Sequence, residues 1–186
     1  MVLGDESRSG LHASDGRLLV RRRPGERCFV ECNHPRHTGP TPGLMVWGAI
    51  SYNSHSPLVF VEGTLYVQDV VRPVLLPFLQ QEGDVLFQQD NARPHTARAT
   101  QRALQDVQQL PWPARPSDLS PIEHVWDMMG RQATRATPLP TTLTELREQV
   151  EQAWNNVSQD SIRHLYDRLD ARVTACIAAR GGYISY

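Results

Sequence analysis

Short apolar runs in the first half of the chain are typical of β-strands. Residues 44–51 and 58–61 are rich in Val, Ile and aromatic residues, and a polar turn separates them. Together with the apolar start at residues 2–3, they predict an antiparallel meander. Another run, 85–87, is too short for a helix and predicts a strand that leaves the core at the polar residues 88–91.

Segments with helical spacing lie between and after these strands. In segment 66–81 apolar residues recur at mostly helical spacing, although Pro73 and Pro77 must kink or interrupt a helix there. We expect a further helix from about Thr96 to Gln105, followed by a strand over residues 107–110.

The end of the chain has a helical pattern. An amphipathic segment begins near Pro140 and continues through Trp154, and Ser158 is placed to cap a second one that continues through Ile177. The pair Gly181-Gly182 stops this second helix. Strands and helices in this order predict an α/β fold with a mixed β-sheet flanked by helices and followed by a helical tail.

The length of 186 residues is that of one domain, which we divide into a core over about 1–135 and C-terminal helices over 136–186. The net charge of -1 does not indicate a nucleic-acid-binding protein, because such domains are usually basic. All 19 basic residues are Arg, however, which suits bidentate phosphate contacts, although a base-composition bias in the gene would explain it equally well.

The cysteines and the hydropathy pattern bear on the cellular compartment. Three cysteines, without a signal-like apolar segment, favour an intracellular, reducing compartment. No run approaches the roughly 18 apolar residues of a membrane span, so we expect no membrane role. Four potential zinc ligands lie close together in the sequence, Cys28, Cys32, His34 and His37. We do not expect them to form a zinc site, because paired zinc ligands usually have a longer loop between the pairs.

Segment 18–30 predicts a hairpin with a strongly cationic tip around a Pro-Gly turn. The basic residues of this tip are Arg21, Arg22, Arg23 and Arg27. They would bind DNA phosphates without sequence preference, or they are the charges of a solvated turn. A short basic run can also serve as a nuclear import signal.

Asp90 follows the strand predicted at residues 85–87. In open α/β sheets ligands bind beyond the carboxyl ends of the strands, so a carboxylate at this position is placed to meet a substrate or a metal. Pro94 predicts a turn before the next helix. The alternative is that Asp90 and Asn91 only shape this turn through side-chain hydrogen bonds.

A second stretch, residues 112–127, reads WPARPSDLSPIEHVWD, and the start of the chain contains Gly4-Asp5-Glu6-Ser7-Arg8. With Gln88-Gln89-Asp90-Asn91-Ala92-Arg93-Pro94-His95, these segments resemble the catalytic domain of Tc/mariner-type DDE transposases. The resemblance covers nearly the whole chain. It implies a ribonuclease H-like fold in which Asp5, Asp90 and Glu123 are the catalytic, metal-binding carboxylates.

Three carboxylates from separate elements suit Mg²⁺ or Mn²⁺, and we expect two ions that assist phosphoryl transfer at DNA phosphorus. As the resemblance implies, water first cuts the transposon ends, and the released 3′-hydroxyl then attacks target DNA. The expected partner is therefore DNA, both transposon ends and target, and we expect no small-molecule substrate. The expected location is the nucleus. Whether the chain forms a homodimer stays an open question. Arg93, His95 and His124 are placed to contact phosphates, or are surface residues.

Other interpretations of the carboxylates stay open. Ser120 and Glu123 match a capping box, in which Glu123 would serve the helix start alone. Asp118 and Asp127 are its rivals for the third position and rank below it on the resemblance. Glu6 should point to the opposite face of its strand from Asp5.

The sequence departs from the family pattern at several places. Positions 91–122, which separate the second and third carboxylates, hold 32 residues, about two fewer than is usual, and the loss falls around residues 106–109. The connection after residues 63–65 is also short, Ser9 replaces an aromatic residue, and Pro116-Ser117 reverses the usual order.

These departures leave a second hypothesis open, a catalytically inactive, transposon-derived remnant that binds nucleic acid or protein partners. The family's upstream pair of helix-turn-helix units has no counterpart in this sequence, so we expect sequence-specific DNA binding to be missing. A generic ribonuclease H-like nuclease is a third interpretation, which the specific motifs disfavour.

Overall fold

The computed structural model describes residues 1–11, 42–63, 66–111, 120–135 and 138–179. Its sheet has four strands in the order β3-β2-β1-β4. Their bounds are Val2–Gly10 for β1, Gly43–Ile50 for β2, Val59–Val61 for β3 and Phe87–Gln88 for β4. Strands β1, β2 and β3 pair antiparallel and β4 pairs parallel with β1, so the predicted meander and mixed sheet are confirmed.

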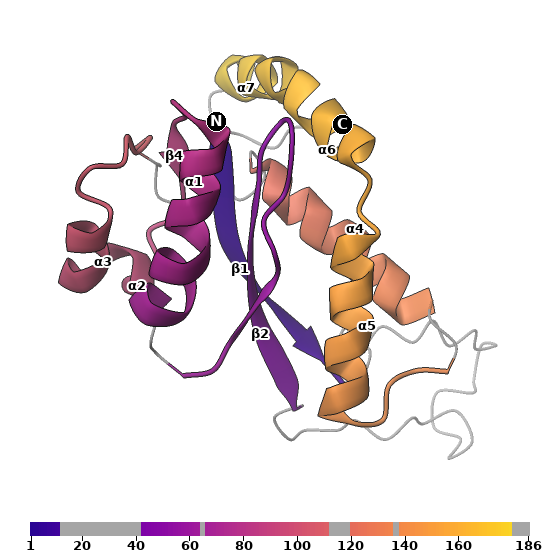
Figure 1. Cartoon of the computed structure of the whole chain (residues 1–186). Coiled ribbons are helices and arrows are strands. Elements are labelled where there is room, and N and C mark those ends of the chain that lie inside the picture. The colour runs from indigo at the N-terminus through magenta and orange to yellow at the C-terminus, as the bar shows by residue number, and fades with distance from the viewer. Residues whose placement is uncertain (12–41, 64–65, 112–119, 136–137, 180–186) are drawn as a thin grey trace, which may run out of the picture.

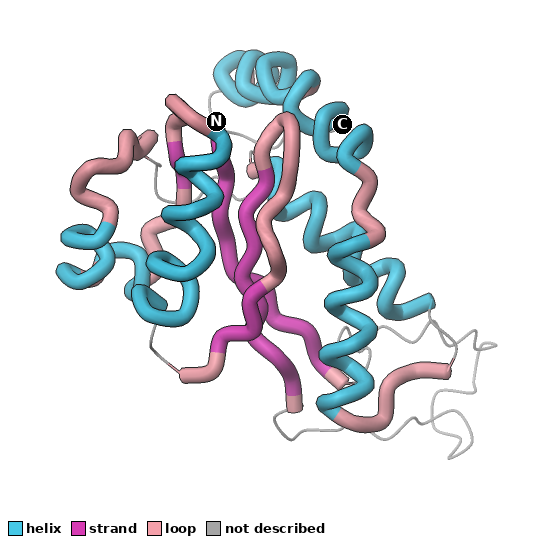
Figure 2. The backbone as a smooth tube through the Cα atoms, in the orientation of Figure 1, coloured by secondary structure: helices cyan, strands magenta, loops and turns pink. Residues whose placement is uncertain are grey.

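Helices cover both faces of the sheet (Figures 1 and 2). Alternation along β1 sends Val2 to one core and Leu3 to the other. The Val2 core includes Trp47 and Phe87 and lies under the helices of residues 67–104. The Leu3 core lies under the C-terminal helices. The bounds of these are Pro121–Arg135 for α4, Leu143–Asn155 for α5, Gln159–Asp167 for α6 and Leu169–Ala178 for α7.

The helix predicted at residues 66–81 forms without a break. It consists of a π-helical part, η3 (Val67–Leu75), and α1 (Leu76–Glu82). Pro73 lies inside the π-helical part, where the N–H of Leu76 bonds to the carbonyl of Val71, five residues back. Pro73 cannot donate a backbone hydrogen bond, and the wider π-helical turn accommodates it next to a continuous helix.

The segment after β4 differs from the prediction. The helix expected from Thr96 to Gln105 is shorter, α3 (Arg98–Ala103), and the extended Ala97 separates it from a preceding short helix, α2 (Arg93–Thr96). The strand expected at residues 107–110 is reduced to a single parallel bridge between Phe87 and Gln109. The backbone of Phe87 makes the hydrogen bonds on both sides of this bridge.

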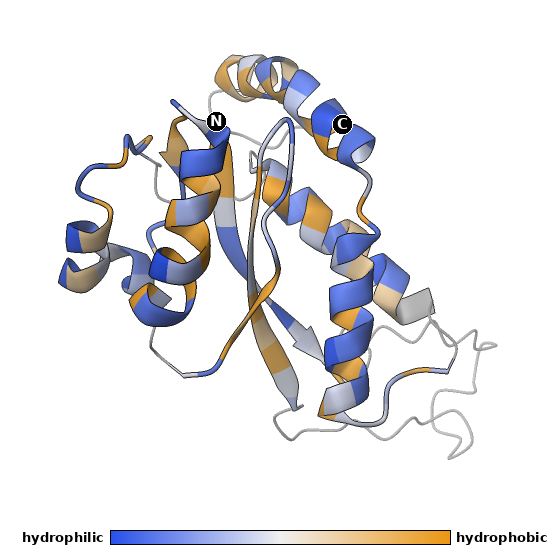
Figure 3. Cartoon of the chain, viewed as in Figure 1, coloured by the Kyte–Doolittle hydropathy of each residue, from blue (hydrophilic) through white to orange (hydrophobic). Residues whose placement is uncertain are grey.

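The C-terminal helices begin where the sequence predicts. Thr142 and Glu145 form a reciprocal capping box at the start of α5, and the Ser158 hydroxyl accepts a hydrogen bond at the start of α6. The helix predicted from Ser158 through Ile177 is divided at Arg168 into α6 and α7, and Gly181-Gly182 lies outside the described residues. Apolar residues of α4 and α5 face the sheet and charged residues face outward (Figure 3).

The hairpin predicted at 18–30 and the Cys28 to His37 cluster also lie outside the described residues. In the part of the chain that the structure describes, no helix has the length and apolar content that crossing a membrane requires.

Candidate active site

Asp5 is the fourth residue of β1, on the same face as Leu3 and therefore beneath α4. The indole Nε1 of Trp126 in α4 donates a hydrogen bond to Asp5 Oδ2 over 3.2 Å. The residue opposite Asp5 on β2 is Gly48. The strand carboxylate and the helix that carries Glu123 are thus joined by a direct contact.

Two stacked tryptophans lie over Gly48. The rings of Trp126 and Trp154 are 5.1 Å apart with an interplanar angle of 27°, and Trp154 Nε1 donates to the carbonyl of Ser56 over 2.8 Å. A Cβ atom at position 48 would lie 2.6 Å from Cη2 of Trp154. The absence of a side chain at Gly48 therefore lets the tryptophans approach β2 and holds Trp126 over Asp5.

Asp90 lies two residues beyond β4, at the carboxyl end of a strand that runs parallel to β1. Its Oδ1 accepts a hydrogen bond from the N–H of Ala92 over 2.9 Å, which is the turn-shaping bond considered as an alternative. The same Oδ1 lies 2.5 Å from Nδ1 of His95. The turn-shaping role thus occupies one oxygen of Asp90.

Glu6 points to the face opposite Asp5, as alternation predicts, and its Oε1 lies 2.8 Å from Nε2 of His95. His95 is 3% exposed and lies between the two carboxylates. Burial favours the neutral ring, but the hydrogen bond and charge of Glu6, together with Asp90, outweigh burial and raise the pKa of His95. A ring that donates to both carboxylates carries two N–H groups, which is the protonated form.

The three predicted catalytic carboxylates act on one another electrostatically. Burial, the charge of Glu123 and the smaller effects of Glu6 and Asp90 raise the pKa of Asp5 to about 7. Glu123, exposed in the first turn of α4, has a pKa raised by partial burial and by the charge of Asp90. The structure therefore brings Asp5, Asp90 and Glu123 into one region of negative potential.

The donor set suits a hard divalent cation. Carboxylate oxygens are the ligands that Mg²⁺ and Mn²⁺ prefer, and a bound cation would offset the mutual repulsion that adds to burial in raising the pKa values of Asp5 and Glu123. A second grouping that could hold an ion consists of Glu6, Asp90 and His95, whose ligand atoms lie within 4.8 Å of one another. The two groupings share Asp90.

The remaining predicted residues have different surroundings. Arg93 in α2 and His124 in α4 are exposed, whereas Arg21, Arg22, Arg23 and Arg27 lie outside the described residues. Of the two rivals of Glu123, Asp127 pairs with Arg131 over 2.7 Å, and Asp118 lies outside the described residues.

From the sequence, His95 was predicted only as a phosphate contact or a surface residue, and no role was predicted for Trp126. The alternation that turns Glu6 away from Asp5 and the short distance in sequence from Asp90 to His95 are signals that point to His95, whereas neither points to Trp126.

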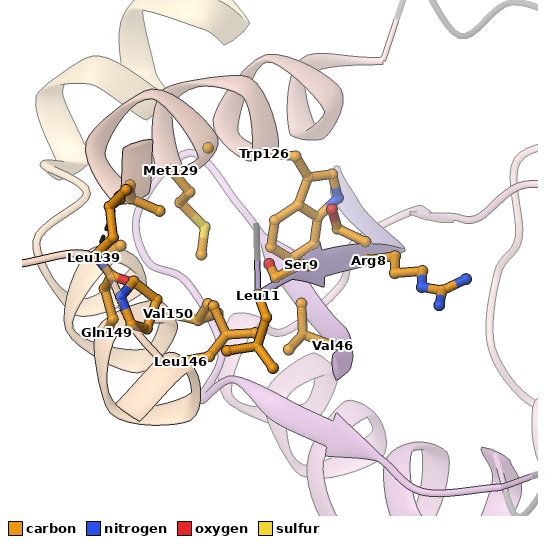
Figure 4. Close-up of a pocket in the computed structure, with 16 residues that line it drawn as sticks. Arg8, Ser9, Leu11, Val46, Trp126, Met129, Leu139, Leu146, Gln149 and Val150 are labelled. Carbon is orange, nitrogen blue, oxygen red and sulfur yellow. Dashed lines mark hydrogen bonds between the residues drawn. The ribbon is translucent and has the colours of Figure 1, made fainter. Parts of the chain in front are cut away.

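A cavity of about 210 Å³ lies beside the site, between the end of β1 and helices α4 and α5. Figure 4 shows Trp126, Met129, Leu146 and Val150 around it, while the side chain of Arg8 extends away. Trp126 thus lines this cavity with its ring and contacts Asp5 with its N–H.

A ribonuclease H-like sheet with three carboxylates near the end of β4 defines a class of nucleic-acid-processing enzymes, and comparison with known proteins agrees. The family described as DDE superfamily endonuclease matches residues 1–147. Solved structures of Mos1 mariner transposase show the same fold. The strand transfer complex matches with a TM-score of 0.73 at 20% identity over 99% of this chain, and the catalytic domain with 0.66 at 15% identity over 98%. The chain covers 55% and 84% of those two proteins, respectively.

Among proteins of similar sequence, the Tc1 transposase of Caenorhabditis elegans is 31% identical over 196 aligned positions, which cover 100% of this chain and 70% of the relative. The Tc3 transposase of the same organism is 29% identical, and the chain covers 58% of its length. The chain therefore belongs to the DDE superfamily of endonucleases and is a transposase catalytic domain of the Tc1/mariner type.

Proposed function

We propose that this domain cleaves DNA and transfers DNA strands in a metal-dependent reaction, with Asp5, Asp90 and Glu123 as the ligands of two Mg²⁺ or Mn²⁺ ions. The observation that carries the proposal is the mutual electrostatic effect of these carboxylates. They come from three separate elements, and burial, followed by the charge of Glu123 and the smaller effects of Glu6 and Asp90, raises the pKa of Asp5 to about 7. Acidic groups whose pKa values are raised by burial and by one another's charges are typical of functional sites.

The chain's own residues would hold and orient the ions. Asp5 is fixed by β1 and by the Trp126 indole, Asp90 by its turn and His95, and Glu123 by the first turn of α4. When bound, the ions would activate the attacking oxygen and stabilise the leaving oxygen of an in-line displacement at phosphorus. Glu123 and Asp90 are the more exposed of the three carboxylates, so DNA would approach the site from the side on which these two residues lie.

The similar Mos1 structures support DNA and divalent ions as the ligands. They include a paired-end complex with the left transposon end and paired-end complexes with Mn and with Mg. For this chain we infer transposon-end DNA and target DNA as the substrates. The exposed Arg93 and His124 are the described residues that we propose as phosphate contacts.

The test is a calorimetric titration of Mn²⁺ into the wild-type protein and its Asp90→Asn variant. We expect saturable binding that the variant loses. Asp127→Asn is the matched control, because Asp127 lies one turn beyond Glu123 but pairs with Arg131, and it should bind Mn²⁺ like the wild type. Nicking of supercoiled plasmid in Mn²⁺, lost in Asp90→Asn, would then show the cleavage step.

One observation favours the inactive remnant as a second candidate. In the shortened connection before Glu123, the expected strand at 107–110 is reduced to the bridge at Gln109. DNA binding without Mn²⁺ binding, unchanged in Asp90→Asn, would support this candidate and refute the catalytic one.

A further inference from the structure

Of the three proposed ligands, Asp90 has the least support from secondary structure. It belongs to no helix or strand, and its side chain is 52% exposed. An exposed carboxylate on a loop samples several rotamers, and a metal ion that needs one of them must restrict it at an entropic cost. In this structure both hydrogen bonds of the Asp90 side chain go to Oδ1, from Ala92 and His95, and the carbonyl oxygen of Asp90 also lies 3.2 Å from Nδ1 of His95. Among the described residues Oδ2 has no such bond.

His95, in contrast, is held from several sides. Its side chain is 1% exposed, and the ring of Tyr66 lies 4.8 Å away between centroids. The hydroxyl of Thr100 donates to the carbonyl of Pro94 over 2.6 Å and so fixes the short helix α2. The Nε2 of His95 bonds to Glu6 on β1, a strand of the central sheet.

We propose that His95, braced by Glu6, is a positioning residue that holds Oδ1 of Asp90 and leaves Oδ2 for a metal ion. This inference rests on the proposed function, which makes Asp90 a ligand, and adds two residues to the site. The chain of contacts runs from the rigid sheet through a buried ring to an exposed ligand. Metal ligands are commonly oriented by such hydrogen-bonded partners, and the loss of one typically weakens metal binding about 10- to 100-fold.

The same three residues could instead hold an ion of their own, and the contacts argue against this. The two ring nitrogens of His95 already contact one carboxylate each, on two edges of the ring. An ion bound to either nitrogen would displace the carboxylate there. If Glu6 were a ligand, Glu6→Gln would abolish Mn²⁺ binding as Asp90→Asn does. If Glu6 only braces His95, the Glu6→Gln variant still binds, with an affinity reduced by less than about tenfold.

Two substitutions of His95 separate its two bonds. In His95→Asn the amide nitrogen falls close to the place of Nδ1 and can still donate to Asp90, while the contact with Glu6 is lost. In His95→Gln the amide nitrogen reaches the place of Nε2 and keeps Glu6, while the contact with Asp90 is lost. Each variant loses one hydrogen bond and part of a buried ring, so both should lower the melting temperature by similar amounts.

Mn²⁺ titration of the two variants is the test. We expect binding about 10- to 100-fold weaker in His95→Gln and within about threefold of wild type in His95→Asn. Equal weakening in both variants, or wild-type affinity in a folded His95→Gln, would overturn the proposal.

Crystal structures of both metal-free variants give a second readout that does not depend on metal binding. In His95→Asn, Asp90 Oδ1 should stay bonded to the N–H of Ala92, and in His95→Gln the carboxylate should leave this position. If the wild type binds no Mn²⁺ but Asp90 moves only in His95→Gln, the proposed function fails and the positioning role stands. An unmoved Asp90 in His95→Gln refutes the positioning role.

Discussion

The substitution Gly48→Ala adds one methyl group beneath the tryptophans that contact Asp5. Its Cβ would lie 2.6 and 2.9 Å from two atoms of Trp154 and 3.1 Å from Trp126, where ordinary contacts begin at 3.4 Å. Trp154 must therefore shift by roughly 1 Å, against a buried ring stack and its hydrogen bond to Ser56. The substitution tests whether close packing at Gly48 places the Trp126 indole on Asp5.

The expected loss of stability is modest but measurable. Overpacking of a core costs about 1–3 kcal/mol, and the gain in strand propensity from Gly to Ala offsets roughly 0.5–1 kcal/mol of it. A net cost of about 1–2 kcal/mol lowers the melting temperature of a domain of this size by about 2–8 °C. Displacement of Trp126 should also weaken its hydrogen bond to Asp5 and reduce Mn²⁺ affinity a few-fold.

The matched control is Gly130→Ala, the same change in α4 at a position where a Cβ meets nothing within 4 Å. Ala is the better helix former, so this variant should gain about 0.5–1 kcal/mol. Differential scanning calorimetry of both variants at one pH measures the two effects. An unchanged or raised melting temperature for Gly48→Ala, or an equal loss in both variants, would refute the packing argument.

Three further predictions concern the carboxylates. The pKa of Asp5 is about 7 in the folded protein against an ordinary value of 3.8, so its contribution to stability is complete below about pH 4 and is lost as the pH rises to about 7. Metal-free protein should therefore melt lower at pH 8 than at pH 5, and Asp5→Asn should reduce this difference. An unchanged difference in Asp5→Asn would contradict the assignment. Trp126→Phe keeps an aromatic ring but removes the N–H donor to Asp5, so Mn²⁺ affinity should fall about tenfold, and the smaller buried ring should also lower the melting temperature. An equal affinity would show that the indole bond does not support the site. Glu123→Gln should abolish Mn²⁺ binding at an unchanged melting temperature if Glu123 is a ligand, whereas a large loss of stability with retained binding would make it a helix cap.

Much of the fold could be predicted because it follows from local patterns. Runs of β-branched residues with a polar turn between them give β2 and β3, and the Ser158 cap gives the start of α6. The position of Asp90 just beyond a strand could also be predicted, because an apolar run that ends in polar residues must leave the core there. These features depend on neighbours in the sequence.

The features that the sequence did not reveal depend on distant contacts. His95 meets Glu6 across 89 positions, and Trp126 meets Asp5 across 121, so no local pattern in the sequence shows these two contacts. The strand at 107–110 fails for a related reason. Its apolar residues suit a strand, but only Gln109 forms a bridge with Phe87, so the pairing partner and not the propensity sets its length.

The shortened connection before Glu123 need not disturb the three carboxylates, because none of them depends on that connection for its position. Asp5 and Asp90 are set by the pairing of β1 with β2 and with β4. Helix α4 packs through Ile122, Val125 and Trp126 into the same core as Leu3, and the Trp126 indole ties it to Asp5. A loss of two residues can then be absorbed where the sheet pairing is already reduced to a bridge, while α4 keeps Glu123 within the electrostatic reach of Asp5.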